Sequence, residues 1–268
     1  MRQGRSYPRM HIIQDLHGIA GRIAGKSPLR NWPVRVKKGL AQGARWTAFP
    51  YSGYWRGETE MDVEQAINQH GAMEGASCWD LGAHFGIYTV GMAMAVGSQG
   101  CVASFEPNPV AFAKCKRHVE MNGLTWVKLF NAGVSDRERT GRLIVGMNCD
   151  SSSAHLLYED EKEEPASGLT EITLVQLDLL VESGAIRRPD FIKVDVEGHG
   201  AKALLGARRS ILETTPTLVV SFHSRWELEG TKELLEPMGY SAQDGSGSPL
   251  TWQECLYRTA ILRTKRRR

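Results

Sequence analysis

The sequence predicts an α/β protein built on a doubly wound, mostly parallel β-sheet. From residue 77 onward, short apolar runs alternate with longer helix-like segments, which is the order of a parallel sheet with right-handed crossover helices. The chain has 268 residues, 41% of them apolar, which is enough for one such domain with a full hydrophobic core. No apolar run reaches the roughly 18–20 residues that a transmembrane helix needs. We therefore expect one packed domain with small appendages.

The first part of the chain is less regular. Segment 11–25 has a weak amphipathic pattern interrupted by glycines, and 32–50 alternates enough to predict short strands around a glycine turn. We assign residues 1–56 to an N-terminal extension. A helix is expected over 57–72, with Thr59 as its cap. Its predicted inner face holds Met61, Val63, Ala66 and Ile67.

The alternating part follows. The pattern predicts strands at 77–81, 101–106, 125–131, 190–196 and 217–222, and helices at 86–97, 109–123, 178–184, 200–214 and 226–239. Residues 132–176 interrupt this order with two further strands, in "RTGRLIVGM" and "LTEITLVQL", around an acidic loop, "YEDEKEEPASG", that we expect to be mobile. An edge strand in "ECLYRTAIL" closes a domain over 57–262, and a basic tail follows at 263–268.

Charge is unevenly distributed along the chain. The net charge is +3, made up of +9 over residues 1–50, −12 over 51–257 and +6 over 258–268. The basic ends either are solvated or dock on the acidic body, or they contact a phosphate, an acidic lipid surface or nucleic acid. Five cysteines without a CxxC pair argue against a disulfide framework and a zinc site. The N-terminal arginines lack a following apolar core, so we expect no secretory signal and a cytoplasmic location.

The turn after the first regular strand, "DLGAHFG" (80–86), predicts the ligand. It fails the G-x-G-x-x-G test for dinucleotides and lacks the G-K-[ST] of a phosphate-binding loop. An acid followed by Gly82 and Gly86 suits a ligand with an ammonium group and a carboxylate lying at a helix N-terminus. Glu106 ends the second strand, where an acid can accept hydrogen bonds from ribose hydroxyls. These features predict S-adenosylmethionine (SAM); the alternative is that Asp80 only caps the helix and Glu106 is only a strand-end acid.

Residues 54–223 resemble the FkbM-type methyltransferases, a branch of the class I SAM-dependent family. The matching pieces are "GYWRGETE", "WDLGAHFGIYT", "SFEPNP", "NAGVSD", "LDLL" with Asp178, and "DFIKVDVEGHGAKALLGA". The last is the most specific, because Lys-Val-Asp-Val-Glu-Gly after a strand is characteristic of that branch. The resemblance implies a seven-stranded, Rossmann-like sheet.

The resemblance also implies where the cofactor lies. It assigns cofactor binding to Asp80, Gly82, His84, Gly86, Glu106, Asn131, Ala132 and Asp195. Within this set, Glu106 would hold the ribose, the segment at 131–132 would border the adenine, and Asp195 would face the sulfonium; for His84, packing over the helix start is the alternative. The chain departs from the family at Gly200 and Ser221, where acids are frequent, and both positions fall on the expected acceptor side.

Methyl transfer to a hydroxyl needs positioning and a base. The catalytic candidates are Asp195, Glu197 and His223, and histidine has the most suitable ordinary pKa, about 6.5. Two alternatives stay open, namely that His223 is a buried core histidine and that Glu197 fixes the turn through backbone N–H groups. A metal site is not predicted, because no third ligand stands near Asp195 and Glu197 in the sequence.

Three functions fit these observations. The first is O-methylation of a hydroxyl on a small molecule or saccharide, which is the prediction we favour. The second is an RNA- or protein-directed methyltransferase that uses its basic ends to hold a polyanion. The third is a non-catalytic SAM-binding module. The sequence predicts neither the identity of the acceptor nor the oligomeric state.

Overall fold

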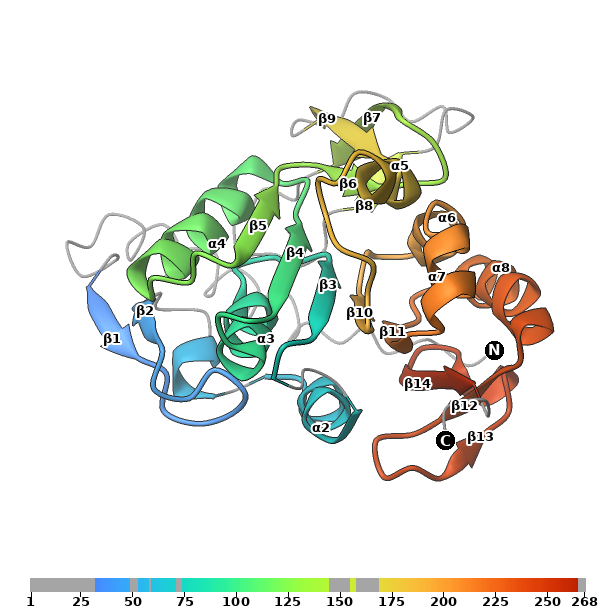
Figure 1. The fold of residues 1–268 in the computed structure, drawn as a ribbon, viewed down its shortest axis with the longest axis horizontal. Coiled ribbons are helices and arrows are strands. Elements are labelled where there is room, and N and C mark those ends of the chain that lie inside the picture. Colours follow the sequence, from blue (N-terminus) through green and yellow to red (C-terminus); the bar gives the residue numbers. More distant parts are fainter. Residues whose placement is uncertain are drawn as a thin grey trace, which may run out of the picture.

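A computed structural model of the chain describes residues 32–48, 53–57, 59–70, 74–144, 155–157 and 169–264. Its central sheet has eight strands, seen nearly along one edge in Figure 1. They are β3 (Ser77–Leu81), β4 (Cys101–Phe105), β5 (Val127–Phe130), β10 (Phe191–Val194), β11 (Thr217–Ser221), β12 (Tyr240–Gln243), β13 (Pro249–Leu250) and β14 (Thr259–Thr264). Their order across the sheet is β13-β12-β14-β11-β10-β3-β4-β5.

The five strands from β11 to β5 are parallel, and β14, β12 and β13 are antiparallel to their neighbours. The predicted doubly wound, mostly parallel fold is therefore confirmed, with the two-residue β13 as an eighth strand. The prediction of an edge strand near the C-terminus was wrong. Strand β14 pairs with β11 on one side and β12 on the other. The strand that covers β14 is β12, and its sequence "YSAQ" at 240–243 is too short and too polar to predict a strand.

Helices cover both faces of this sheet (Figure 1). They are α2 (Met61–His70), α3 (Ile87–Val96), α4 (Pro109–Met121), α5 (Leu177–Glu182), α6 (Gly200–Leu205), α7 (Arg208–Thr214) and α8 (Arg225–Leu235), with short 3-10 turns η2 (Gly53–Arg56), η3 (Glu236–Met238) and η4 (Gln253–Cys255). The first three pack in one buried cluster and the last four border another. None of the helices in the described residues is long and apolar enough to cross a membrane.

The strands form two cores because their side chains alternate between the faces. In β3, Cys78 joins the cluster under α2, α3 and α4, whereas Trp79 and Leu81 join the cluster under α5 to α8. In β10, Phe191 and Ile192 divide in the same way. Burial on both faces explains why these strands read as continuous apolar runs in the sequence.

Two helix predictions need correction. The segment 200–214 forms two helices, because the carboxylate of Asp178 accepts hydrogen bonds from the backbone N–H groups of Arg209 and Ser210 and so caps a new helix start. Helix α2 begins at Met61 rather than at residue 57. The hydroxyl of Thr59 has no partner among the described residues, so Thr59 is not the cap.

The predicted inner face of α2 is only partly right. Val63, Ala66 and Ile67 are buried, whereas Met61 is 80% exposed because it is the first helical residue. The other predicted strands and helices occur at the expected places, with ends that differ by one or a few residues.

Two small sheets flank the domain. Strands β1 (Pro33–Arg35) and β2 (Arg45–Thr47) form the predicted hairpin, and its Trp46 stacks on His118 of α4. Strands β6 (Gly133–Val134), β7 (Arg139–Ile144), β8 (His155–Leu157) and β9 (Leu169–Val175) form the second sheet, in the order β6-β9-β7-β8. The expected helix at 11–25, the acidic loop at 158–168 and the tail from 265 lie outside the described residues, and the division into three segments stays a prediction.

Candidate functional site

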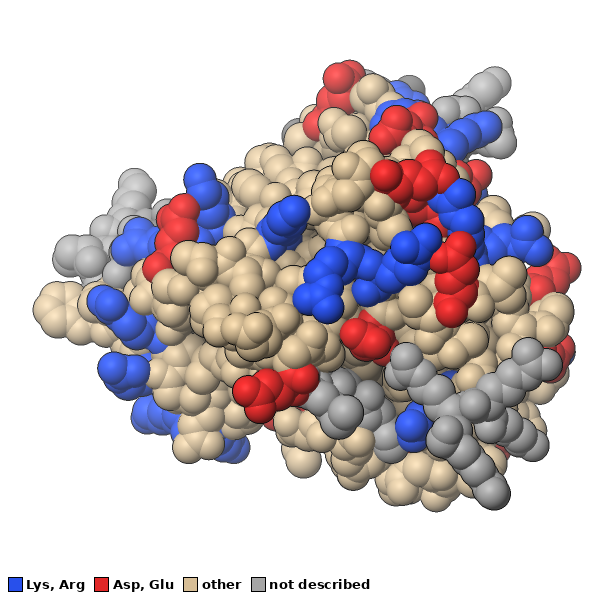
Figure 2. Space-filling model, in the orientation of Figure 1, with Lys and Arg blue, Asp and Glu red and all other residues tan. Residues whose placement is uncertain are grey.

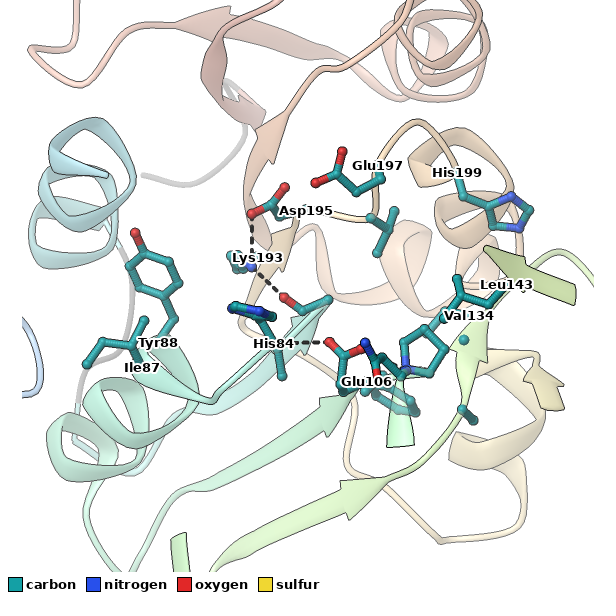
Figure 3. A pocket seen from close by; sticks show the side chains of 18 of the residues that line it. His84, Ile87, Tyr88, Glu106, Val134, Leu143, Lys193, Asp195, Glu197 and His199 are labelled. Carbon is teal, nitrogen blue, oxygen red and sulfur yellow. Dashed lines mark hydrogen bonds and ion pairs between the residues drawn. The ribbon is translucent and has the colours of Figure 1, made fainter. Parts of the chain in front are cut away.

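A pocket opens at the carboxyl ends of β3, β4 and β10 (Figure 3). It lies where the order of the sheet reverses, since the chain adds strands outward from β3 to β5 and then returns to β10 on the other side of β3. Ligands of open α/β sheets bind at such a point. Of the residues predicted from the sequence, the pocket is lined by Gly82, His84, Glu106, Ala132, Asp195, Glu197 and His223.

The two glycines of the turn, Gly82 and Gly86, have different structural roles. Gly82 has φ +84°, and a Cβ there would lie 1.8 Å from the carbonyl oxygen of Asp195, so only glycine lets the β3 turn cross the end of β10 so closely. Gly86 has φ +85°, and a Cβ there would lie 2.6 Å from Sγ of Cys115. Gly86 therefore allows α3 to pack on α4, and it is not part of the pocket lining.

Glu106 lies at the end of β4 with its carboxylate held by the turn. Oε2 accepts a hydrogen bond from the backbone N–H of His84 at 2.6 Å, and Oε1 accepts one from Asn108 at 2.8 Å. Burial raises the pKa of Glu106 to about 7, although these two N–H groups lower it. A fixed carboxylate that faces the pocket is the arrangement a ribose diol requires.

Asn131 and Ala132 separate into two places. The side-chain amide of Asn131 donates to the backbone oxygens of Glu106 and Pro107, at 2.8 and 3.2 Å, so it ties down the end of β4 from outside the pocket. Ala132, Val134 and Leu143 all line the pocket. This side of the cavity is therefore apolar, which suits a planar base.

Asp80 lies below the pocket rather than in its wall. It is fully buried, accepts a hydrogen bond from Thr89 and lies 3.5 Å from Nζ of Lys193. Lys193 is the residue that reaches the pocket, with Nζ 2.8 Å from the carbonyl oxygen of Gly82 and 3.4 Å from Asp195 (Figure 3). Burial alone would lower the pKa of Lys193, but the carboxylates of Asp195 and Asp80 outweigh it and raise that pKa. The predicted contact of Asp80 with the cofactor stays a prediction. In the structure Asp80 contacts Lys193, and Lys193 lines the pocket.

Sequence reasoning missed Lys193, and a signal for it was present. It is a charged residue in the middle of the apolar strand β10, and such a residue is rarely buried unless it is paired. Of the partners that make this burial stable, Asp195 follows β10 two residues after Lys193, whereas Asp80 comes from the neighbouring strand β3. The pairing with Asp80 was visible only once β3 and β10 were known to be adjacent.

Two histidines of the pocket wall, His84 and His199, are neutral. Burial lowers the pKa of His84 to about 4 and that of His199 to about 4. His84 has φ +51°, stacks on Phe85 with ring centroids 3.8 Å apart, and lies 3.2 Å from the hydroxyl of Tyr54. It therefore both packs over the helix start and lines the pocket. Tyr54 places η2 at the pocket as well.

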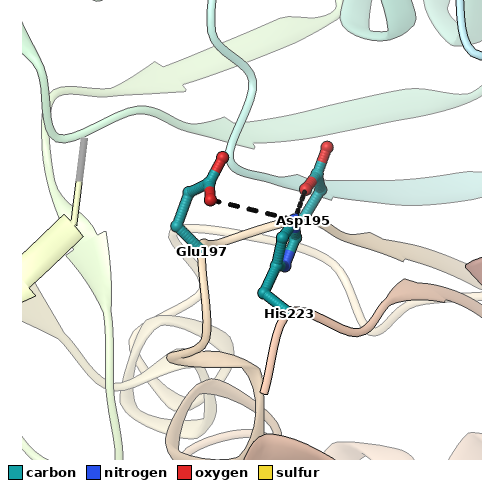
Figure 4. A group of neighbouring side chains, drawn as sticks. All are labelled: Asp195, Glu197 and His223. Carbon is teal, nitrogen blue, oxygen red and sulfur yellow. Dashed lines mark ion pairs between the residues drawn. The ribbon is translucent and has the colours of Figure 1, made fainter. Parts of the chain in front are cut away.

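Three titratable side chains meet on the other side of the pocket (Figure 4). Nε2 of His223 lies 3.4 Å from Oδ1 of Asp195 and 3.9 Å from Oε2 of Glu197. Glu197 has φ +50°, and burial raises the pKa of its carboxyl. All three are partly exposed, so they face the open part of the pocket. Their ligand atoms lie within 4.8 Å of one another, so the fold supplies the third metal-ligating group that the sequence did not show.

A second missed residue, Glu227, holds this cluster from behind. Its carboxylate accepts hydrogen bonds from the backbone N–H groups of Gly200, at 2.9 Å, and His223, at 2.8 Å. A Cβ on Gly200 would lie 2.5 Å from Oε1 of Glu227, so this glycine makes room for that carboxylate. Ser221 instead pairs with Thr259 of β14 at 3.1 Å. The signal for Glu227 was the Ser-x-x-Glu pattern at 224–227 that begins α8.

The carboxylates of Glu227, Asp195 and Glu197 together raise the pKa of His223 to about 9, although burial lowers it. His223 is therefore an imidazolium at neutral pH in the cofactor-free protein. Within the described part of the chain no backbone amide donates to Glu197, so its carboxylate is free to face a ligand.

Comparison with known proteins identifies the family. The model of the FkbM methyltransferase domain matches residues 80–258, more than half of the chain. The chain is 24% identical over 242 residues to the hexuronic acid methyltransferase AglP of Haloferax volcanii, which covers 88% of this chain and 84% of the relative. It is 25% identical over 179 residues to Methyltransferase 1 of Beauveria bassiana, covering 60% and 71%. The chain belongs to the FkbM methyltransferase family, as the motifs predicted.

Solved structures show weaker likenesses. An FkbM methyltransferase from Methylobacillus flagellatus matches with a TM-score of 0.46 and 21% identity over 70% of this chain, which spans 43% of that protein. Fibrillarin from Aeropyrum pernix, solved with bound S-adenosyl-L-methionine, matches with a TM-score of 0.44 and 12% identity over 75% of this chain and 71% of that one. Both TM-scores lie below 0.5, so the family assignment rests on the domain model.

Proposed function

We propose that this member of the FkbM family transfers a methyl group from SAM to a hydroxyl group of a saccharide. The observation that carries the proposal is the meeting of Gly82, Glu106 and Asp195 around one pocket at the switch point of the sheet. Support for a saccharide acceptor comes from the match, along most of both chains, to a hexuronic acid methyltransferase.

The residues of the pocket fit this cofactor. Glu106 offers a fixed carboxylate for the ribose hydroxyls, and the apolar side formed by Ala132, Val134 and Leu143 suits the adenine. Gly82 leaves the backbone bare where the methionyl tail would lie, and Asp195 offers a negative charge to a sulfonium. When bound, SAM supplies a methyl group that is already activated on sulfur. What remains for the protein is to orient the acceptor and to take its proton.

We assign the proton to Glu197. Its carboxylate is partly exposed beside Asp195, and burial raises its pKa, so it is a stronger base than an exposed glutamate. Glu197 would accept the proton of an acceptor hydroxyl placed beside it, and SAM, when bound, would supply the methyl group to that oxygen. His223 was the base favoured from sequence. In this proposal it gives up that role, because an imidazolium has no free lone pair to accept a proton.

Calorimetry and a transfer assay test the two parts. We expect S-adenosylhomocysteine to bind and NAD not to bind; tighter binding of NAD would remove the cofactor assignment. With methyl-labelled SAM, we expect label on oligosaccharides that contain a hexuronic acid, as an ether that survives mild alkali. An alkali-labile product would be a methyl ester, so the acceptor would be the carboxylate and no base would be needed. Cofactor binding without transfer to any saccharide would favour the non-catalytic alternative.

The polyanion-directed alternative has less support among the described residues. Its basis is the basic charge of the two ends, and residues 1–31 and 265–268 lie outside the described part. On the face shown in Figure 2, Lys and Arg side chains lie among Asp and Glu side chains rather than forming one basic surface. Steep loss of acceptor binding with rising salt would nevertheless reinstate it.

A further inference from the structure

Glu60 is a carboxylate of the pocket wall that has no role in the proposed transfer. It stands immediately before α2, where its backbone oxygen accepts a hydrogen bond from the N–H of Glu64 at 3.0 Å. The hydroxyl of Tyr88, in the first turn of α3, donates to the same oxygen at 3.5 Å. Because the starts of two helices hold its backbone, Glu60 has a fixed place in the wall, where it stays exposed.

The pocket has two chemically different sides, which Figure 3 separates. Val134 and Leu143 lie on one side and Tyr88 lies on the other, with Glu106 between them. The proposed function gives the apolar side to the adenine and Glu106 to the ribose. A cofactor that spans the pocket in this order has its methionyl tail on the α3 side, next to Glu60.

The methionyl tail carries an ammonium group, which needs a carboxylate partner once it leaves water. The sequence pointed to Asp80 for this group. In the structure Asp80 is fully buried, accepts a hydrogen bond from Thr89 and is not among the residues that line the pocket. A carboxylate that contacts the ammonium must therefore come from the wall itself, and Glu60 is the lining carboxylate that is held against α3.

Groups of opposite charge meet on this side of the pocket. Burial lowers the pKa of Lys193, whereas the carboxylates of Asp195, Asp80 and Glu60 raise it, so Glu60 lies within electrostatic reach of that amino group. Lys193 lines the pocket as well. Glu60 and Lys193 thus offer one negative and one positive group to a tail that carries one charge of each sign.

We propose that Glu60 is a cofactor-binding residue whose carboxylate accepts the ammonium group of the methionyl tail of SAM. A carboxylate has about four acceptor sites and an ammonium has three N–H donors, and a hydrogen bond between two charged groups is among the strong ones. The contact holds the tail at the start of α3 and so fixes how far along the pocket the sulfur lies. The inference rests on the proposed function, because it takes SAM as the ligand.

Calorimetry with two ligands tests the proposal on the full chain. S-adenosylhomocysteine carries the ammonium, whereas its deamino analogue keeps the adenosine, the sulfur and the carboxylate but has hydrogen in place of the amino group. We expect Glu60→Gln to weaken binding of S-adenosylhomocysteine at least tenfold and to leave binding of the analogue unchanged or tighter. Glutamine keeps the size of the side chain and removes the charge that attracts the ammonium.

A control variant separates ligand binding from helix charge, since acids are favoured at helix N-termini whether or not a ligand binds. Asp62 lies in the first turn of α2, is exposed and is not among the residues that line the pocket. Asp62→Asn should leave the affinity for both ligands unchanged. An equal loss of affinity for both ligands in Glu60→Gln would make Glu60 a structural part of the wall and overturn the proposal.

The unmodified protein provides a test that does not depend on the folding of Glu60→Gln. It should bind S-adenosylhomocysteine more tightly than the deamino analogue, and equal affinities would overturn the proposal. Binding of S-adenosylhomocysteine that Glu60→Gln leaves unchanged would contradict the role of Glu60 alone. Lack of binding to the unmodified protein would contradict the cofactor of the proposed function and, with it, this inference.

Discussion

Replacing Gly82 by alanine tests the close approach that shapes the cofactor pocket. The added Cβ would lie 1.8 Å from the carbonyl oxygen of Asp195, and real Cβ atoms essentially never come within 3.0 Å of such an atom. One of the two backbone segments must therefore move by at least about 1.2 Å, the difference between these distances. The left-handed φ of +84° adds about 1–2 kcal/mol of strain for a residue with a Cβ.

We expect Gly82→Ala to lose about 3–5 kcal/mol of unfolding free energy, because backbone displacement in a tightly packed sheet adds to the strain. Gly123→Ala is the matched control, since Gly123 also has a positive φ, +64°, but nothing lies within 4 Å of its Cβ position. It should lose only the strain, about 1–2 kcal/mol. Urea unfolding followed by circular dichroism measures both.

Cofactor affinity provides a second measurement on the same two variants. Gly82→Ala should also lose binding of S-adenosylhomocysteine in its folded fraction, because the displaced turn forms part of the pocket wall. Gly123→Ala should bind as the unmodified protein does. Equal losses of stability in the two variants would refute the argument, since they would show that the approach of β3 to β10 imposes no steric constraint.

Three further predictions concern charged groups of the pocket. Glu106→Ala should weaken cofactor binding by about 1.5–3 kcal/mol in calorimetry, because hydrogen bonds to a charged partner are lost; a change within error would remove Glu106 from the ribose role. Asp195→Asn should reduce cofactor affinity at least tenfold with a smaller loss of stability, because Lys193 keeps Asp80 and the Gly82 carbonyl as partners. A large fall of the urea midpoint with unchanged cofactor affinity would show that Asp195 is structural. The pKa of His223, raised to about 9, stabilises the folded protein fully below about pH 6.5, and this stability is lost as the pH rises through 9. After allowance for the partial exposure of His223, the loss is about 1–2 kcal/mol of unfolding free energy. His223→Gln should abolish this part of the pH dependence of unfolding.

The central fold was predictable because its apolar strand runs and its helix start and stop residues are both local features of the sequence. Buried parallel strands such as β3 and β10 read as continuous apolar runs. Helix α4 carries a start signal, the cap Asn108 with Pro109 as first helical residue, and a stop signal, Gly123 after its end. The strands at the C-terminal end were less predictable. The position of β14 inside the sheet depends on its pairing with β12, which is a contact between segments rather than a pattern in either.

The pocket residues that directly follow a strand could be predicted from the sequence. The charged residues that pair with groups from other elements could not. Gly82, Glu106 and Asp195 each end a strand, so their convergence followed from the parallel order alone. The burial of Lys193 and the reach of Glu227 from α8 depend on which helices and strands are neighbours. The sequence therefore favoured His223 as a base, because the carboxylates that together raise its pKa come from separate elements of the chain.

The pocket concentrates negative charge around a place where a cationic cofactor is expected. Burial raises the pKa values of Glu60, Glu106 and Glu197, and neighbouring carboxylates add to each. Neighbouring carboxylates also raise the pKa of His223, whereas burial lowers it. A positive charge placed among these groups lowers every one of these pKa values, so all of them respond to it in the same direction.

Cofactor binding should therefore release protons near neutral pH, and SAM should release more than S-adenosylhomocysteine, which lacks the sulfonium charge. The number released is obtained by calorimetry at pH 7 in buffers with different enthalpies of ionisation. Equal release by SAM and S-adenosylhomocysteine in the unmodified protein would show that the sulfonium does not lie among these carboxylates, and the orientation assigned to the cofactor, with Asp195 at its sulfur, would be wrong.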